Sequence, residues 1–240
     1  MSYQASEKLQ KIQSKYTIDG GVWTDEIAEQ ELVLHYLTPE DSVLEIGGNI
    51  GRVSLIISTI VPGERHIVLE SNKKYAETLQ KNRDRNQASF KVEASALSSS
   101  PLYQHPKGWT TFTDSEYNHE SFEKRIPPGT SKSEFVPVST ISLPGLKDKY
   151  RISFNTLIID CEGAFYYILI DYPEILEGVT KVIVENDYPD VSHKRFVETL
   201  YLKYGLTLVE NHNLPEAYHR FHPNPEIHQS FYQVWIKKDK

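Results

Sequence analysis

The sequence predicts an α/β domain with a mainly parallel sheet and helices on both faces. Short runs rich in β-branched residues alternate with segments of helical periodicity, which is the pattern of a doubly wound sheet. The 240 residues are 39% hydrophobic and 25% charged, so the chain can bury one full core. This composition excludes disordered, collagen-like and fibrous proteins.

Two helices are expected before the sheet, at residues 4–16 and 25–37. Helix-length segments separate most of the strands that follow. Apolar, β-branched runs predict seven strands, at residues 42–46, 66–70, 89–92, 156–160, 181–185, 206–210 and 231–236. Residues 1–38 are therefore expected to form an N-terminal helical segment, and residues 39–240 the main domain.

Two stretches interrupt the alternation of strands and helices. Residues 98–135 are rich in Ser, Thr, Pro and aromatic residues, and prolines divide residues 211–229 too closely for a regular helix. Insertions of this length are usually functional or disordered. We expect both stretches to lie over one rim of the sheet as loops that face an acceptor.

Charge, cysteine content and hydropathy limit the partners and the compartment. The formal charge of −7 disfavours a nucleic-acid partner, because phosphate backbones repel an acidic protein. A single cysteine, Cys161, permits no internal disulfide, which fits a reducing compartment. No apolar stretch approaches the length of a bilayer span, and the N-terminal residues lack the apolar block of a signal peptide. We therefore expect a cytoplasmic protein that does not insert into a membrane.

The strongest local signal is a strand that runs into a glycine-rich turn, Val43-Leu44-Glu45-Ile46-Gly47-Gly48-Asn49-Ile50-Gly51, and then into a helix. Glycines let the backbone turn sharply and approach a ligand, and the helix N-terminus adds N–H donors. Glu70 follows Gly51 by 19 residues, at the end of the next strand, where an acid can accept hydrogen bonds from both ribose hydroxyls. The two signals together predict a site for a nucleotide-like cofactor.

The spacing of the glycines distinguishes between cofactors. A dinucleotide fingerprint, G-x-G-x-x-G, would need glycines at two positions of this turn that hold other residues, so NAD is disfavoured. The pattern Glu45-x-Gly47-x-Asn49-x-Gly51 instead resembles motif I of the class I S-adenosylmethionine-dependent methyltransferases. That resemblance implies a Rossmann-like fold with a seven-stranded, mainly parallel sheet and an antiparallel last strand. It also implies that Glu45 lies near the amino group of the cofactor and that Glu70 holds the ribose.

Further motifs narrow the resemblance to the FkbM-type methyltransferases, over about residues 40–190. They are Leu69-Glu70-Ser71-Asn72, Lys81-Asn82-Arg83-Asp84-Arg85-Asn86, Glu93-Ala94-Ser95-Ala96-Leu97-Ser98 and Ile159-Asp160-Cys161-Glu162-Gly163. Ile158 and Phe165 depart from the family pattern, which often has a lysine and a second glutamate there, and either change could alter the acceptor. The resemblance implies S-adenosylmethionine as the cofactor, bound by Glu45, Gly47, Gly48, Asn49, Gly51, Glu70, Ser71, Ala94, Ser95 and Asp160.

Polar residues at the ends of two later strands are the candidates for chemistry. Methyl transfer to an aliphatic hydroxyl needs a base or a metal, because the pKa of the hydroxyl lies far above neutrality. Asp160, Glu185 and Asn186 resemble the ligand set of metal-dependent O-methyltransferases, and their oxygen atoms suit magnesium or manganese. The metal-free alternative takes a base from Asp160, Glu162 or His193. The sequence leaves both alternatives open.

The sequence thus predicts an S-adenosylmethionine-dependent O-methyltransferase that acts on a hydroxyl of a carbohydrate (glycan or sugar) or another small molecule. The family resemblance implies this acceptor class, and Trp109 and Tyr117 in the polar insertion are compatible with stacking on a sugar. Two alternatives stay open. One is a protein or RNA methyltransferase, and the other is a catalytically inactive cofactor-binding module.

Overall fold

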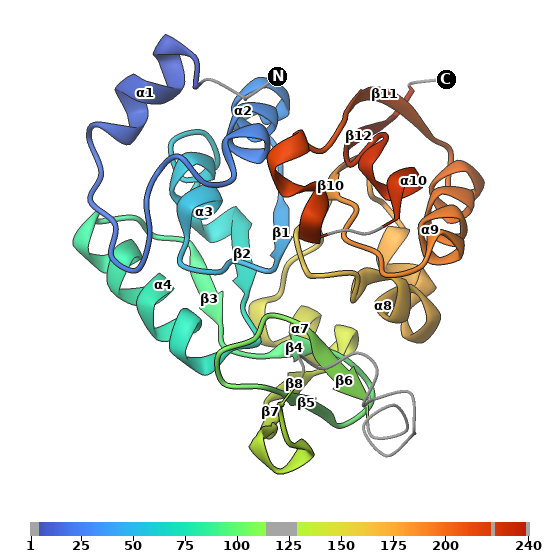
Figure 1. Ribbon diagram of the computed structural model, residues 1–240. Helices are drawn as coiled ribbons and strands as arrows, with labels where there is room; N and C mark the ends of the chain where they lie inside the picture. Colours follow the sequence, from blue (N-terminus) through green and yellow to red (C-terminus); the bar gives the residue numbers. More distant parts are fainter. Residues whose placement is uncertain (1–4, 114–128, 222–223, 239–240) are drawn as a thin grey trace.

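A seven-stranded sheet forms the centre of the molecule in the computed structural model, which describes residues 5–113, 129–221 and 224–238 (Figure 1). From one edge to the other, the strands are β11 (Leu206–His212), β12 (Tyr232–Lys237), β10 (Lys181–Glu185), β9 (Thr156–Ile159), β1 (Val43–Ile46), β2 (His66–Leu69) and β3 (Lys91–Glu93). Only β12 runs antiparallel to its neighbours. This confirms the predicted mainly parallel sheet and the antiparallel last strand, and the predicted strand bounds differ only at their ends.

Helices cover both faces of the sheet. They are α1 (Glu7–Gln13), α2 (Ile27–Tyr36), α3 (Arg52–Ile57), α4 (Lys73–Arg85), α7 (Leu143–Tyr150), α8 (Phe165–Asp171), α9 (Val191–Lys203) and α10 (Pro225–His228). The described residues also form the 3-10 helices η1 (Gly63–Arg65), η2 (Lys132–Glu134), η3 (Pro173–Leu176) and η4 (Glu216–Phe221). The chain winds outward from β1 to β3 and then returns to β9, so right-handed crossovers place α3 and α4 on one face and α8 and α9 on the other.

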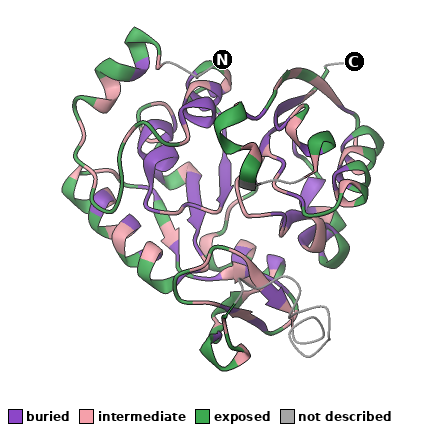
Figure 2. Ribbon diagram, in the orientation of Figure 1, coloured by how far each residue is buried: buried purple, intermediate pink, exposed green. Residues whose placement is uncertain are grey.

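The core lies between the sheet and these helices. All residues of β1, β2 and β9 are buried, because parallel strands are covered on both faces (Figure 2). The N-terminal helices share this core, since Leu9 of α1 and Val33 of α2 belong to the same cluster as Leu44 and Val182 of the sheet. Helix α2 packs against α3 and reaches β10 and β12.

The first insertion, residues 98–135, forms strands rather than only loops. Its β5 (Leu102–Gln104) pairs antiparallel with β6 (Thr111–Thr113) and β7 (Val136–Val138), and beside it β4 (Ala96–Leu97) pairs with β8 (Thr140–Ile141). The second insertion holds the end of β11, η4 and α10, so it contains no long helix. Among the described residues, no helix combines the length and the apolar character that crossing a bilayer requires.

Candidate cofactor and acceptor site

The glycine turn between β1 and α3 packs directly on the end of β9. Gly47 has a φ of 97°, and a Cβ atom there would lie 1.5 Å from the carbonyl oxygen of Asp160. Gly51 has a φ of 93°, and its Cβ would lie 2.5 Å from Leu79 Cδ1. Both positions therefore need glycine for their backbone conformation and for packing. The turn is held at the switch in strand order, where ligands of open α/β sheets bind.

Glu70 lies beside this turn, just after β2. Its carboxylate accepts hydrogen bonds from the backbone N–H of Asn49 and of Asn72, each at 2.7 Å. Burial raises the pKa of Glu70 to about 7, although these two N–H donors favour the ionised form. Glu70 therefore connects the glycine turn to the start of α4 and titrates near neutral pH.

A cavity beyond the carboxyl ends of β1, β2 and β9 collects most of the residues predicted to bind the cofactor. Six of them line it, namely Gly47, Asn49, Glu70, Ser71, Ser95 and Asp160. Ala96 and Leu97 line the cavity where Ala94 was predicted to do so, and Tyr167 and Ile168 of α8 add apolar surface. This end of the cavity therefore suits a flat, largely apolar group, while the Glu70 end is polar.

Glu45, Gly48, Gly51 and Ala94 are absent from the lining of this cavity. The Glu45 carboxylate is buried and binds Ser54 Oγ at 2.8 Å and His66 Nε2 at 2.7 Å. Each of its oxygens thus has a partner inside the protein, and the contact with the cofactor amino group stays a prediction. Glu45 connects β1 to α3 and β2.

The first insertion is fastened over the cavity by polar side chains. Gln104 donates from Nε2 to Ser71 Oγ at 3.2 Å and to the carbonyl oxygen of Trp109 at 2.7 Å. Asn72 donates from Nδ2 to the carbonyl oxygens of Pro106 and Gly108, each at 3.2 Å. The Trp109 side chain is 58% exposed and lines the cavity. Tyr117, the second aromatic residue predicted to stack on an acceptor, lies outside the described residues.

A second, larger cavity joins the first one and is rich in acids. Asn49, Trp109, Asp160 and Glu162 line both cavities. Its wall contains Asp25, Glu26, Arg52, Glu185, Asp187, Glu216, Tyr218 and Tyr232. The arrangement places two carboxyls, those of Asp160 and Glu162, at the junction between a cofactor-sized groove and an open acceptor space.

Desolvation shifts the titration of these junction acids. Burial, followed by repulsion from Glu29 and Glu26, raises the pKa of Asp160 well above its usual range. Burial also raises the pKa of Glu162. The Asp160 and Glu162 carboxyls are therefore stronger bases than exposed carboxylates, as a general base for a hydroxyl requires.

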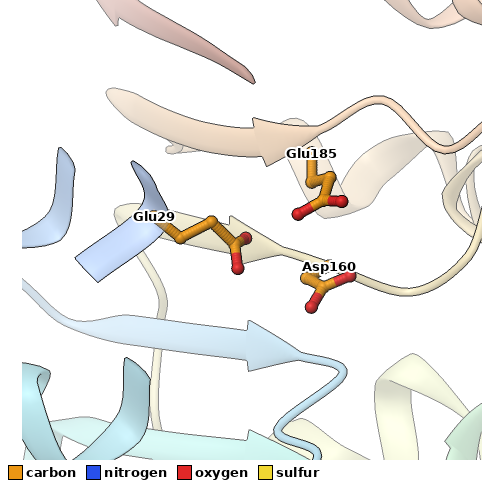
Figure 3. Close-up of side chains that lie close together, drawn as sticks. All are labelled: Glu29, Asp160 and Glu185. Carbon is orange, nitrogen blue, oxygen red and sulfur yellow. The ribbon is translucent and has the colours of Figure 1, made fainter. Parts of the chain in front are cut away.

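Within the predicted ligand set of Asp160, Glu185 and Asn186, the two carboxyls lie close together. Asn186 is 1% exposed and donates from Nδ2 to the carbonyl oxygens of Ser230, at 3.2 Å, and Phe231, at 2.9 Å. Its Oδ1 atom, the potential metal ligand, is buried without a hydrogen-bond partner among the described residues, so its place in the ligand set stays a prediction. Glu29 of α2, which was not predicted, lies beside Asp160 and Glu185 (Figure 3).

His193, a predicted base, lies in the first turn of α9 and lines neither cavity. Its ring stacks on Tyr166 of α8, with the centroids 3.7 Å apart and an interplanar angle of 6°. The loop after β10 leads His193 into the α8–α9 interface rather than toward the strand ends. The structure therefore leaves Asp160 and Glu162 as the candidate bases.

Solved structures share this architecture. A candidate O-methyltransferase from Klebsiella pneumoniae has a TM-score of 0.50 at 11% identity, over 98% of this chain and 92% of that chain. The fold is that of the class I S-adenosylmethionine-dependent methyltransferases. An O-methyltransferase from Streptomyces achromogenes, solved with S-adenosylmethionine, has a TM-score of 0.48 at 13% identity, over 98% of this chain and 92% of that chain. A candidate tRNA methyltransferase from Streptococcus pneumoniae has a TM-score of 0.49 at 12% identity, over 88% and 69%.

No family model and no curated protein matches this chain. Within the methyltransferase fold, the K-N-x-x-x-N motif of α4 has a structural role. Asn82 Nδ2 donates to the carbonyl oxygen of Ile50, at 2.8 Å, and to that of Asp19, while Asn86 exchanges hydrogen bonds with the backbone of Thr17. The two asparagines thereby attach the N-terminal segment to the glycine turn.

Sequence reasoning missed two residues that shape the site of this methyltransferase fold, Glu29 and Gln104. Glu29 precedes Leu32 by three residues and Val33 by four, so helical periodicity places it on the apolar face of α2. A carboxyl on such a face is a signal that the sequence does contain. Gln104 had no comparable signal, because its partners Ser71 and Trp109 become neighbours only in the folded chain.

Proposed function

We propose that the protein is an S-adenosylmethionine-dependent O-methyltransferase that acts on a hydroxyl of a carbohydrate or another small molecule, as the FkbM-type resemblance implies. The observation that carries the proposal is the pair of joined cavities with Asp160 and Glu162 at their junction. One cavity has the glycine turn and Glu70 at the positions that a methyltransferase fold uses for its cofactor. The other is open and wide enough to admit an acceptor from solvent.

The residues around the junction have distinct tasks in this proposal. Glu70 accepts hydrogen bonds from the ribose hydroxyls, and the apolar surface around Leu97 and Ile168 receives the adenine. When bound, S-adenosylmethionine supplies an electrophilic methyl group on its sulfonium. Asp160 would hold the acceptor hydroxyl and take its proton as the methyl group is transferred and S-adenosylhomocysteine is released. Glu162 is the neighbouring candidate for the same task, and it would be the base if Asp160 binds a metal ion.

The acceptor cavity supports a small ligand better than a nucleic acid. Carboxyls dominate its wall, and its one arginine, Arg52, is already paired with Asp25 at 2.9 Å and with Glu26 at 2.7 Å. A phosphate backbone would be repelled by such a surface. The half-exposed indole of Trp109 offers a flat face on which a sugar or another ring can stack. The acids at the ends of β9 and β10 could serve the acceptor either as bases or as ligands of a magnesium or manganese ion.

Methyl transfer is tested by incubating the protein with labelled S-adenosylmethionine and a panel of small glycosides, polyols and phenols, and identifying methyl ethers by mass spectrometry. We expect a methyl ether from the wild-type protein. Asp160→Asn should lower its rate of formation at least about 100-fold, because the amide cannot accept the proton. Asp148→Asn, which changes an exposed acid on α7, should retain the wild-type rate.

Measuring the affinity of each variant for S-adenosylhomocysteine distinguishes loss of the catalytic base from unfolding of the protein. In Asp160→Asn this affinity should fall by less than about tenfold, far less than the rate, since the change spares the Glu70 end of the cavity. A fully active Asp160→Asn variant would remove Asp160 from the mechanism. Methyl groups found only on nitrogen or carbon would contradict O-methylation.

A further inference from the structure

Three carboxyls from three elements converge at the carboxyl ends of β9 and β10, beside the acceptor cavity. Glu29 comes from α2, Asp160 follows β9, and Glu185 ends β10. Figure 3 shows the three side chains pointing toward one another, and one oxygen of each lies within 4.8 Å of the others. Oxygens that share one ion at about 2.1–2.6 Å from the metal are at most about 4–5 Å apart. The separation therefore fits a single bound cation.

Glu29 is the carboxyl in this group whose surroundings point to a bound ligand. Its side chain is 2% exposed, and its Oε2 atom is buried without any hydrogen-bond partner. It lies in a helix whose neighbouring residues Ile27, Ala28, Leu32 and Val33 belong to the hydrophobic core. An unpartnered buried carboxyl costs several kcal/mol in ordinary packing, and a metal ion is one of the partners that removes this cost.

No basic side chain within the described parts of the chain forms an ion pair with Glu29, Asp160 or Glu185. Arg52, which acts electrostatically on Glu29, is engaged by Asp25 and Glu26. Repulsion from Asp187, another acid, adds to burial in raising the pKa of Glu185. The group therefore has an excess of negative charge that only protons or an added cation can balance.

We propose that Glu29, Asp160 and Glu185 bind one divalent cation, Mg²⁺ or Mn²⁺, and that this ion ties the N-terminal helix α2 to the ends of β9 and β10. Three carboxylate ligands and no nitrogen or sulfur ligand match these hard cations. Asp160 and Glu185 also line the acceptor cavity, so the ion lies beside the bound acceptor. The role of this ion toward the acceptor rests on the proposed methyltransferase function. Cation binding itself does not depend on that function.

The proposal predicts that the full chain, stripped of metal, binds one Mn²⁺ ion without cofactor or acceptor, measured from the loss of the free Mn²⁺ signal in electron paramagnetic resonance. Glu29→Gln should weaken this binding at least about tenfold while preserving side-chain shape. Glu31→Gln is the matched control, because it removes a carboxyl two residues away that binds Ser6 instead of the cluster. It should bind Mn²⁺ like wild type, and Mg²⁺ should compete.

Thermal unfolding gives a second readout for the same variants. Mn²⁺ should raise the melting temperature of the wild type and of Glu31→Gln but not of Glu29→Gln, which should itself be at least as stable as the metal-free wild type. No Mn²⁺ binding, or equal binding by Glu29→Gln, would overturn the proposal. Stabilisation by ethylammonium and not by Mn²⁺ would overturn it too, since the carboxyls would then serve an amine-bearing ligand. Failure of S-adenosylhomocysteine to bind the same sample would contradict the proposed methyltransferase function alone.

Discussion

Replacing Glu70 with glutamine should lower the affinity for S-adenosylhomocysteine at least about 100-fold. A charge-assisted hydrogen bond contributes about 1.5–3 kcal/mol, and the proposed ribose contacts comprise two of them. The amide would also turn an N–H group toward Asn49 or Asn72, whose backbone N–H groups now donate to the carboxylate. Isothermal titration calorimetry measures the change. Glu64→Gln, an exposed substitution before β2, is the control and should bind like wild type.

The raised pKa of Glu70 predicts that cofactor binding depends on pH. Because burial raises the pKa of Glu70 to about 7, the ionised form that accepts ribose hydroxyls is complete only above that pH. Affinity for S-adenosylhomocysteine should therefore fall as the pH is lowered from about 8 to about 6. Glu70→Gln should lose this dependence. An unchanged pH profile in the variant would remove Glu70 from the ribose site.

Replacing Gly47 with alanine should lower the free energy of unfolding by more than about 3 kcal/mol. The added Cβ would lie 1.5 Å from the carbonyl oxygen of Asp160, and the φ of 97° is unfavourable for any side chain. Gly178→Ala separates these causes, because Gly178 has a φ of 79° and nothing within 4 Å of its Cβ position. That variant should cost only about 1–2 kcal/mol. If both variants lost the same free energy of unfolding, measured by urea denaturation, the close approach of β1 to β9 would not be critical for stability.

The sheet was predictable because its parallel strands are buried on both faces. Such strands appear in the sequence as continuous apolar runs, as Leu157–Ile159 and Val182–Val184 show. The small sheet of the first insertion was not predicted. Its strands β5 and β6 each have three residues, which is too short for a period of two to be recognised. Only the hydrogen-bonded pairing between β5 and β6 makes these short segments strands.

The candidate site was predictable where its residues are close in sequence. The glycine turn and Glu70 belong to one strand–helix–strand unit, and six of the ten predicted cofactor residues line the cavity. The partners of side chains at the strand ends could not be predicted, since the Asn186 amide donates to the backbone of Ser230, which is 44 residues away in sequence. Glu29 reaches the site from the N-terminal segment, so only the packing of α2 on the sheet could reveal it.

Calorimetric titration of S-adenosylhomocysteine into the purified full chain, kept free of divalent cations, tests the central claim most directly. We expect saturable binding of one molecule per chain, which Glu70→Gln abolishes and Glu64→Gln retains. If no heat of binding appears with the folded wild-type protein, the cavity beside the glycine turn does not hold this cofactor, and the methyltransferase function is contradicted.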